Sequence, residues 1–139
     1  MRIMGIDYGD SRVGIAMSDP LGYTAQGLKT LPNKVYSKLL ESVISVATEY
    51  NVTAIVVGLP KNMDGSEGFR ADIAKNFVAD LKLKLPGVEF IYQDERLTTV
   101  QASTFLNATN TRGKSRKNVI DTVAAEIILQ SYLDSNKNM

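Results

Sequence analysis

The pattern of apolar and polar residues in the first thirty positions predicts three strands. Arg2 to Tyr8 is strand-like, and apolar residues alternate with small ones from Val13 to Ser18, with a turn at Gly9 to Ser11 between the two segments. Two strands joined by so short a turn indicate a hairpin. A third short strand is predicted from Ala25 to Thr30, because it follows a turn at Pro20 to Gly22.

After Lys34 the apolar residues follow the period of a helix. They form a stripe with neighbouring apolar residues on its flanks, and the stripe consists of Leu39, Val43, Ala47 and Tyr50. This spacing predicts an amphipathic helix. The continuous apolar run Ala54 to Val57, which ends at Gly58-Leu59-Pro60, predicts a strand buried on both faces. Such a strand has parallel neighbours.

Three more helices and one more strand are predicted in the second half of the chain. A helix from about Glu67 to Leu85 is stopped by Pro86-Gly87, and a strand from Glu89 to Tyr92 follows. A capping-box pattern opens a helix from Thr98 to about Leu106. The last helix is predicted from Lys117 to Tyr132.

This order of elements predicts an α/β fold. Three strands in an antiparallel meander, followed by strands and helices in alternation, indicate a five-stranded mixed sheet with helices on both faces. A length of 139 residues predicts one domain over residues 1–139. No run approaches the roughly 20 apolar residues of a membrane helix, and the N-terminus lacks a signal-peptide pattern. We therefore expect a cytoplasmic protein with no membrane partner.

The composition restricts the chemistry that this chain can perform. It contains no cysteine and no histidine, which excludes disulfides, thiol nucleophiles, zinc sites built on these residues and imidazole bases. An enzyme with this composition must use carboxylates, Lys, Ser, Tyr or a metal ion held by oxygen ligands. Because the net charge is only +1, a nucleic-acid partner would have to meet a local basic patch.

Three acidic residues are candidates for an active site. Asp7 is at the C-terminal end of the first strand, where open α/β sheets bind ligands, although a turn-forming aspartate is an equally good interpretation. Asp121 heads the otherwise apolar or aromatic row of Ala125, Ile128 and Tyr132 and should face the sheet. The alternative is that Asp121 is an outward-facing acid in a first helical turn, which the helix dipole favours by about 0.3 to 1 kcal/mol.

Glu95 follows a strand, but a solvated turn would explain it by itself, and Asp94 could be the inward acid instead.

On one mixed sheet, Asp7, Glu95 and Asp121 can converge on the same edge. Two carboxylates ~4 Å apart repel by roughly 4 kcal/mol at an effective dielectric near 20, so such a cluster requires protons or a cation. Mg²⁺ or Mn²⁺ would satisfy it, and one or two such ions can promote phosphodiester cleavage without an imidazole base. We therefore interpret the three acids as both catalytic and metal-binding residues of a nuclease.

A basic segment is predicted beside this edge. No acid occurs from Leu97 to Ile120, and the polar stretch Asn107 to Arg116 is predicted as a loop. The basic residues at its end and at the start of the last helix are Arg112, Lys114, Arg116 and Lys117. A solvated surface loop is the simpler interpretation, but the position beside the acids favours contact with phosphates. Arg96, next to Glu95, is a further candidate for contact with nucleic acid.

The segment Gly58 to Gly68 links a strand to the start of a helix, where backbone N–H groups can hold a phosphate. It lacks the Gly-Lys-Ser/Thr sequence of a nucleotide-binding P-loop, and ordinary turn chemistry explains it about as well. Lys61 and Arg70 are its candidate phosphate ligands. Close approach of a phosphate or another backbone is predicted at four glycines, which are Gly9, Gly14, Gly58 and Gly65.

Several short motifs together resemble one protein family. They are Gly5-Ile6-Asp7-Tyr8-Gly9, Arg12-Val13-Gly14, Ser18-Asp19, Gly58-Leu59-Pro60 with Asp64-Gly65, Asp94-Glu95-Arg96-Leu97-Thr98-Thr99, and Asp121 before Ala124-Ala125. Their order and spacing resemble the bacterial YqgF/RuvX family of Holliday junction resolvases or ribosomal RNA precursor nucleases. The resemblance implies a ribonuclease H-like fold, a divalent metal, and a catalytic set at Asp7, Glu95 and Asp121. It also implies ribosome biogenesis, through maturation of the 5′ end of pre-16S rRNA.

Two other interpretations compete with a nuclease. An actin-like ATPase or sugar kinase is suggested by Asp-Tyr-Gly followed by Arg12 and Gly14, but those folds close two such lobes around a nucleotide and this chain supplies one. A non-catalytic nucleic-acid-binding module would need the basic segment and not the acids. The residues leave open RNA against DNA, endonuclease against exonuclease, and monomer against homodimer, although a resolvase would need a two-fold dimer.

Overall fold

A computed structural model describes residues 2–60, 64, 66–94 and 113–137, with the side chains of the last helix described from Thr122 to Ser135. The strands are β1 (Arg2–Tyr8), β2 (Arg12–Ser18), β3 (Ala25–Pro32), β4 (Val52–Leu59) and β5 (Glu89–Asp94). The helices are α1 (Tyr36–Glu49), α2 (Phe69–Lys84) and α4 (Gly113–Lys137). None of these helices combines the length and the apolar character required to span a membrane.

The strands form one mixed sheet in the order β3-β2-β1-β4-β5. The pairs β1–β2 and β2–β3 are antiparallel, because short turns join these strands. The pairs β1–β4 and β4–β5 are parallel, since the helices α1 and α2 lie in the connections that return the chain to the same edge. The predicted five-stranded sheet with its antiparallel meander is confirmed.

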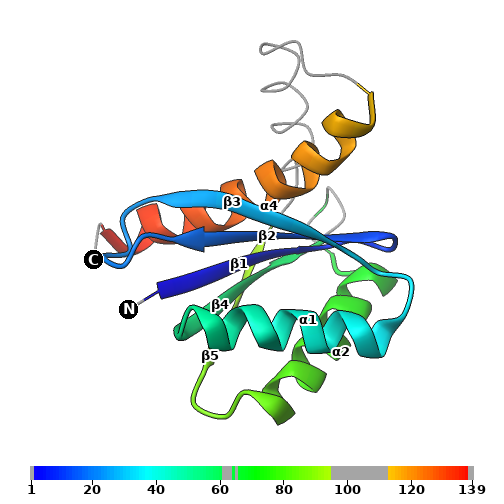
Figure 1. Cartoon of the computed structure of the whole chain (residues 1–139), viewed down its shortest axis with the longest axis horizontal. Helices are drawn as coiled ribbons and strands as arrows, with labels where there is room; N and C mark the ends of the chain where they lie inside the picture. Colours follow the sequence, from blue (N-terminus) through cyan, green and yellow to red (C-terminus); the bar gives the residue numbers. More distant parts are fainter. Residues whose placement is uncertain (1, 61–63, 65, 95–112, 138–139) are drawn as a thin grey trace.

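Helices cover both faces of the sheet, as predicted (Figure 1). Alternation along β1 separates two cores. Met4 and Ile6 pack on the side of α1 and α2. Ile3 packs on the side of α4 together with Ala125, Ile128 and Leu129. Odd-numbered positions of β1 therefore face α4, and even-numbered positions face α1 and α2.

The helix α4 runs antiparallel to β1 (Figure 1). The backbone N–H of Ala25 donates to the side chain of Gln130 at 2.8 Å, and that of Gly27 donates to Glu126 at 2.9 Å. Later residues of β3 thus contact earlier residues of α4, so the two elements are antiparallel. β3 has the same direction as β1, because both strands are antiparallel to β2. The N-terminal half of α4 lies toward the end of β1 that carries Asp7.

The helix boundaries differ from the predicted ones where the chain is polar. α1 has the predicted stripe, whereas the last helix begins at Gly113 instead of Lys117, so positions 113–116 are helical and not a loop. Lysine and arginine are good helix formers, but a polar first turn leaves no apolar periodicity to detect. The predicted helix from Thr98 to Leu106 and positions 107–112 lie outside the described residues.

Candidate active site at the carboxyl edge of the parallel strands

Asp7 lies half-buried near the C-terminal end of β1, on the face covered by α4. It is paired with Gly14 of β2. On its other side, Gly58 of β4 occupies the next position after the pair Ile6 and Val57. Two of the predicted glycines therefore flank Asp7 on the neighbouring strands. Without side chains there, another group can approach the sheet closely beside this carboxylate.

The backbone of α4 brings position 121 toward this edge. Gly5, two residues before Asp7, faces Ala125 and Leu129, and a Cβ atom built on Gly5 would lie 2.7 Å from the Cβ of Leu129. Asp121 lies one turn before Ala125 in a helix that runs antiparallel to β1. The side chain of Asp121 is outside the described part of the chain.

The sequence left open whether Asp94 or Glu95 is the inward acid, and the register of β5 bears on this choice. Asp94 is exposed at the end of β5 and is paired with Leu59, which packs against α2. It therefore lies on the opposite face of the sheet from Asp7. Glu95 is not among the described residues, and within those residues no three potential metal ligands gather.

The turn after Asp7 is fixed by contacts that the sequence analysis did not anticipate. A Cβ atom on Gly9 would lie 2.4 Å from the carbonyl oxygen of Arg12, so only glycine fits there. The side-chain amide of Asn33 donates to the Gly9 carbonyl at 2.8 Å, and its backbone N–H donates to the Ser11 carbonyl at 2.9 Å. These bonds tie the end of β3 to the turn. Only the place of Asn33 in a polar connection after a strand could have suggested this role.

Arg70 lies in the first turn of α2 at the same edge of the sheet. Its guanidinium is 3.2 Å from the carboxylate of Asp10, with the two side chains 66% and 61% exposed. Solvent weakens so exposed an ion pair, so Arg70 can exchange this partner for a phosphate. A small cavity of about 40 Å³ beside the pair is lined by Tyr8, Pro60 and Ile73.

The remaining predicted basic residues are only partly described. Lys114, Arg116 and Lys117 lie in the first turns of α4, but their side chains are not described. The predicted sites outside the described residues are Lys61, Gly65, Arg96 and Arg112.

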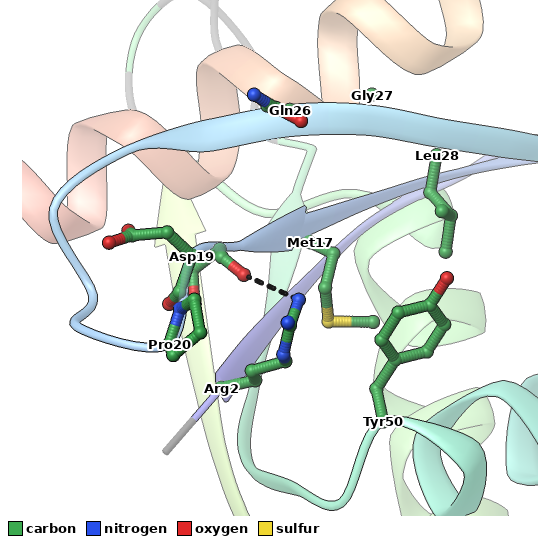
Figure 2. A pocket seen from close by; sticks show the side chains of 9 residues that line it. Arg2, Met17, Asp19, Pro20, Gln26, Gly27, Leu28 and Tyr50 are labelled. Atoms are coloured by element: carbon green, nitrogen blue, oxygen red, sulfur yellow. Dashed lines mark hydrogen bonds between the residues drawn. The ribbon is translucent and has the colours of Figure 1, made fainter.

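A larger cavity, of about 310 Å³, lies at the other end of the sheet (Figure 2). Figure 2 shows the Arg2 side chain between the Asp19-Pro20 turn and Met17. The guanidinium of Arg2 lies 5.5 Å from the centre of the Tyr50 ring. Arg2 is five positions before Asp7, a separation of roughly 16 Å along a strand. This cavity is therefore separate from the edge that carries Asp7.

The topology and the placement of Asp7 define a ribonuclease H-like protein with a carboxylate at the carboxyl edge of its sheet. RuvC of Thermus thermophilus in complex with a Holliday junction has this fold, with a TM-score of 0.63 and 14% identity over 100% of this chain and 97% of that one. The fowlpox virus resolvase in complex with Holliday junction DNA also has this fold, with a TM-score of 0.61. It is 15% identical to this chain, and the match covers 98% of this chain and 99% of the resolvase. At these identities the likeness establishes the fold alone.

Residues 1–135 match the family model described as "RuvX: Holliday junction resolvase", and the chain belongs to this family. A protein of Halothermothrix orenii is 48% identical over 134 residues, which are 96% of this chain and 95% of that protein. A protein of Acetivibrio thermocellus is 45% identical over 136 residues, which are 97% of this chain and 96% of that protein. Both carry the name "Putative pre-16S rRNA nuclease".

Proposed function

We propose that this chain is a metal-dependent nuclease that cleaves phosphodiester bonds of precursor 16S rRNA in the cytoplasm. Its family and the names of relatives at 45% and 48% identity support a nuclease acting on this RNA. The observation that carries the proposal is the position of Asp7, half-buried at the carboxyl edge, with α4 running back toward that edge. Asp7, Glu95 and Asp121 are the proposed catalytic set.

The donors fit a hard divalent cation. All three proposed ligands are carboxylates, the chain has no histidine or cysteine, and Mg²⁺ and Mn²⁺ prefer oxygen ligands. Gly14 and Gly58 permit a phosphate oxygen to come close to Asp7. When bound, the cation would activate water and stabilise the leaving oxygen. The basic residues at positions 112, 114, 116 and 117, with Lys61, Arg70 and Arg96, would hold flanking phosphates.

Of the neighbouring acids Asp94 and Glu95, we propose Glu95 as the metal-binding catalytic residue. Asp94 ends β5 on the face of α2, away from Asp7. A carboxylate that binds the same cation as Asp7 must lie on the face of α4. The two acids therefore provide a matched comparison. Glu95→Gln should remove cleavage, while Asp94→Asn should leave it within a fewfold of wild type.

Resolution of four-way DNA junctions is the second candidate activity. The description of the matching family model and the fold shared with two resolvases favour it. Two symmetric cuts on a junction would require a two-fold dimer, whereas trimming of an RNA end would not. The substrate and the oligomeric state are therefore tested together.

The deciding experiment offers the purified protein and Mn²⁺ both a pre-16S rRNA fragment with its 5′ flank and a four-way DNA junction. We expect cleavage of the RNA by a monomer. Cleavage of the junction alone, by a dimer, would replace the proposal with the resolvase. Binding of RNA without cleavage of either substrate would indicate a non-catalytic binding module.

Substitution of the first acid separates catalysis from binding. We predict that Asp7→Asn lowers Mg²⁺-dependent cleavage by at least about 10³-fold, because a metal ligand contributes several kcal/mol to transition-state stabilisation. RNA affinity in EDTA should stay within a fewfold, since the basic residues are untouched. Single-turnover cleavage and filter binding measure the two quantities, with Asp94→Asn, on the opposite face of the sheet from Asp7, as the matched control. Full cleavage by Asp7→Asn would remove this residue from the mechanism.

A further inference from the structure

We infer that the nucleic-acid strand continues from the carboxyl edge across the start of α1, where Lys34 and Lys38 bind phosphates flanking the cut. This inference rests on the proposed nuclease function and adds a second phosphate-binding surface to it. Neither lysine was singled out by the sequence. We call this surface the α1 phosphate track, and it consists of Lys34 and Lys38.

The contacts of Asn33 fix the place of the track. Asn33 bonds to the carbonyl groups of Gly9 and Ser11 in the turn that follows Asp7, and Lys34 is the next residue. Pro32, at the end of β3, pairs with Arg12 on the other side of the same turn. Lys34 lies two residues before α1 and Lys38 lies in its first turn, so both lysines are at the edge that carries Asp7.

Both lysines are exposed, and their charges are not used elsewhere in the described structure. Among the residues described, no carboxylate forms an ion pair with Lys34 or Lys38. The first turn of α1 contains no acidic residue, and Val35 provides no side-chain cap. Positive side chains near a helix N-terminus are unfavourable by about 0.3 to 1 kcal/mol. The stability of α1 therefore does not account for these lysines, whereas an anionic partner does.

The track complements the basic residues already predicted. Lys114, Arg116 and Lys117 belong to α4, which covers one face of the sheet, and α1 covers the other face (Figure 1). Arg70 lies at the same edge, on the side of α2. A strand crossing the edge would thus meet basic residues on both sides of Asp7. Phosphates on one flank of the cut would contact α4, and those on the other flank would contact the track.

A charge-matched pair of variants tests the track. In Lys34→Gln/Lys38→Gln the positive charges at the start of α1 are removed, and in Lys82→Gln/Lys84→Gln two exposed charges are removed from the last turn of α2, at the opposite edge. The slope of log K against log salt is negative, and we expect the first variant to reduce its magnitude by about 1.4 on single-stranded RNA, about 0.7 for each phosphate. It should raise KM and leave kcat unchanged. The control should change neither slope nor KM.

Substrates of different length locate the contact. With RNA shortened on one flank of the cleavage site, wild type and the α1 variant should become equal in KM, while shortening of the other flank should preserve their difference. Melting temperatures within about 2 °C of wild type would verify that both variants fold. Equal slopes for the α1 variant and the control, or a KM difference that survives both truncations, would overturn the track. Absence of cleavage by the wild type would instead refute the proposed function.

Discussion

Asp19 stabilises the turn between β2 and β3 through its carboxylate. One oxygen accepts hydrogen bonds from the backbone N–H groups of Tyr23 at 2.7 Å and Thr24 at 2.8 Å, and the other accepts from Leu21 at 3.3 Å. The bond from Thr24 is the largest cause that lowers the pKa of Asp19 below its ordinary value of 3.8. The sequence suggested a turn here, and the structure adds the residue that holds it.

The lowered pKa of Asp19 fixes the direction of a pH effect. The stabilisation is fully present above pH 3.8, the ordinary pKa, and is lost as the pH falls through the lower pKa of the folded state. We predict that Asp19→Ala is less stable than wild type at pH 7 and that the difference shrinks only as the pH falls below 3.8. Urea unfolding at pH 7 and at a pH below 3.8 measures it. A difference independent of pH would show that the charge of Asp19 is unimportant.

Single residues also show what sequence interpretation can propose and what it cannot. Asp7 could be selected because a strand end in an α/β sheet is a recurrent ligand position. Asn33 could not, because its role depends on hydrogen bonds to a turn 24 residues earlier in the chain. Periodicity describes the neighbours of a residue within one element and carries no information about such contacts between elements.

The close packing of α4 against β1 depends on the absence of a side chain at Gly5. A Cβ atom there would lie 2.7 Å from the Cβ of Leu129 and 3.0 Å from the carbonyl oxygen of Ala125. We predict that Gly5→Ala pushes α4 away from β1 and costs about 1 to 3 kcal/mol of unfolding free energy. Cleavage should fall further than this loss explains, because Asp7 and Asp121 belong to the two elements that separate.

Val78→Ala is a suitable control for Gly5→Ala. Val78 belongs to α2 and is buried in the core between α2 and the face of the sheet away from α4. It should lower stability by a similar amount and retain cleavage below its melting temperature. If both variants lose cleavage in equal measure, the spacing between β1 and α4 is not what limits activity.

Elements with an apolar stripe were predictable, and their polar ends were not. The stripe of α1 and the continuous apolar run of β4 correspond to buried residues in the structure. The first turn of α4 has only polar residues and glycine, so no pattern separates it from a loop. The choice between Asp94 and Glu95 likewise required the register of β5 against β4, which the sequence does not specify.

At the scale of the molecule, the order of elements was sufficient to predict the sheet. Three strands with short turns must form an antiparallel meander, and strands joined through helices must be parallel. The antiparallel run β3-β2-β1 follows from these rules, whereas the pairing of β4 with β1 was not predicted and is a finding of the structure. The convergence of the three acids was predicted in the same way and stays a prediction, because Glu95 and the side chain of Asp121 lie outside the described part of the chain.

A bound cation would link parts of the molecule that are distant in sequence. We predict that Mn²⁺ raises the melting temperature of the wild type, with a stabilisation of about 2.7 kcal/mol when its concentration is 100 times its Kd. The Asp7→Asn variant should show little or no shift, and EDTA should reverse the effect. Differential scanning calorimetry measures it. Equal shifts for both proteins would place the cation elsewhere.

The packing of α4 also determines when this protein can finish folding during its synthesis. β1 is synthesised well before α4, yet Ile3 of β1 belongs to the same buried cluster as Leu129 and Leu133 of α4. Until α4 emerges from the ribosome, the face of the growing sheet that carries Ile3 lacks the helix that buries it. Nascent chains therefore cannot complete this core before α4 has been synthesised.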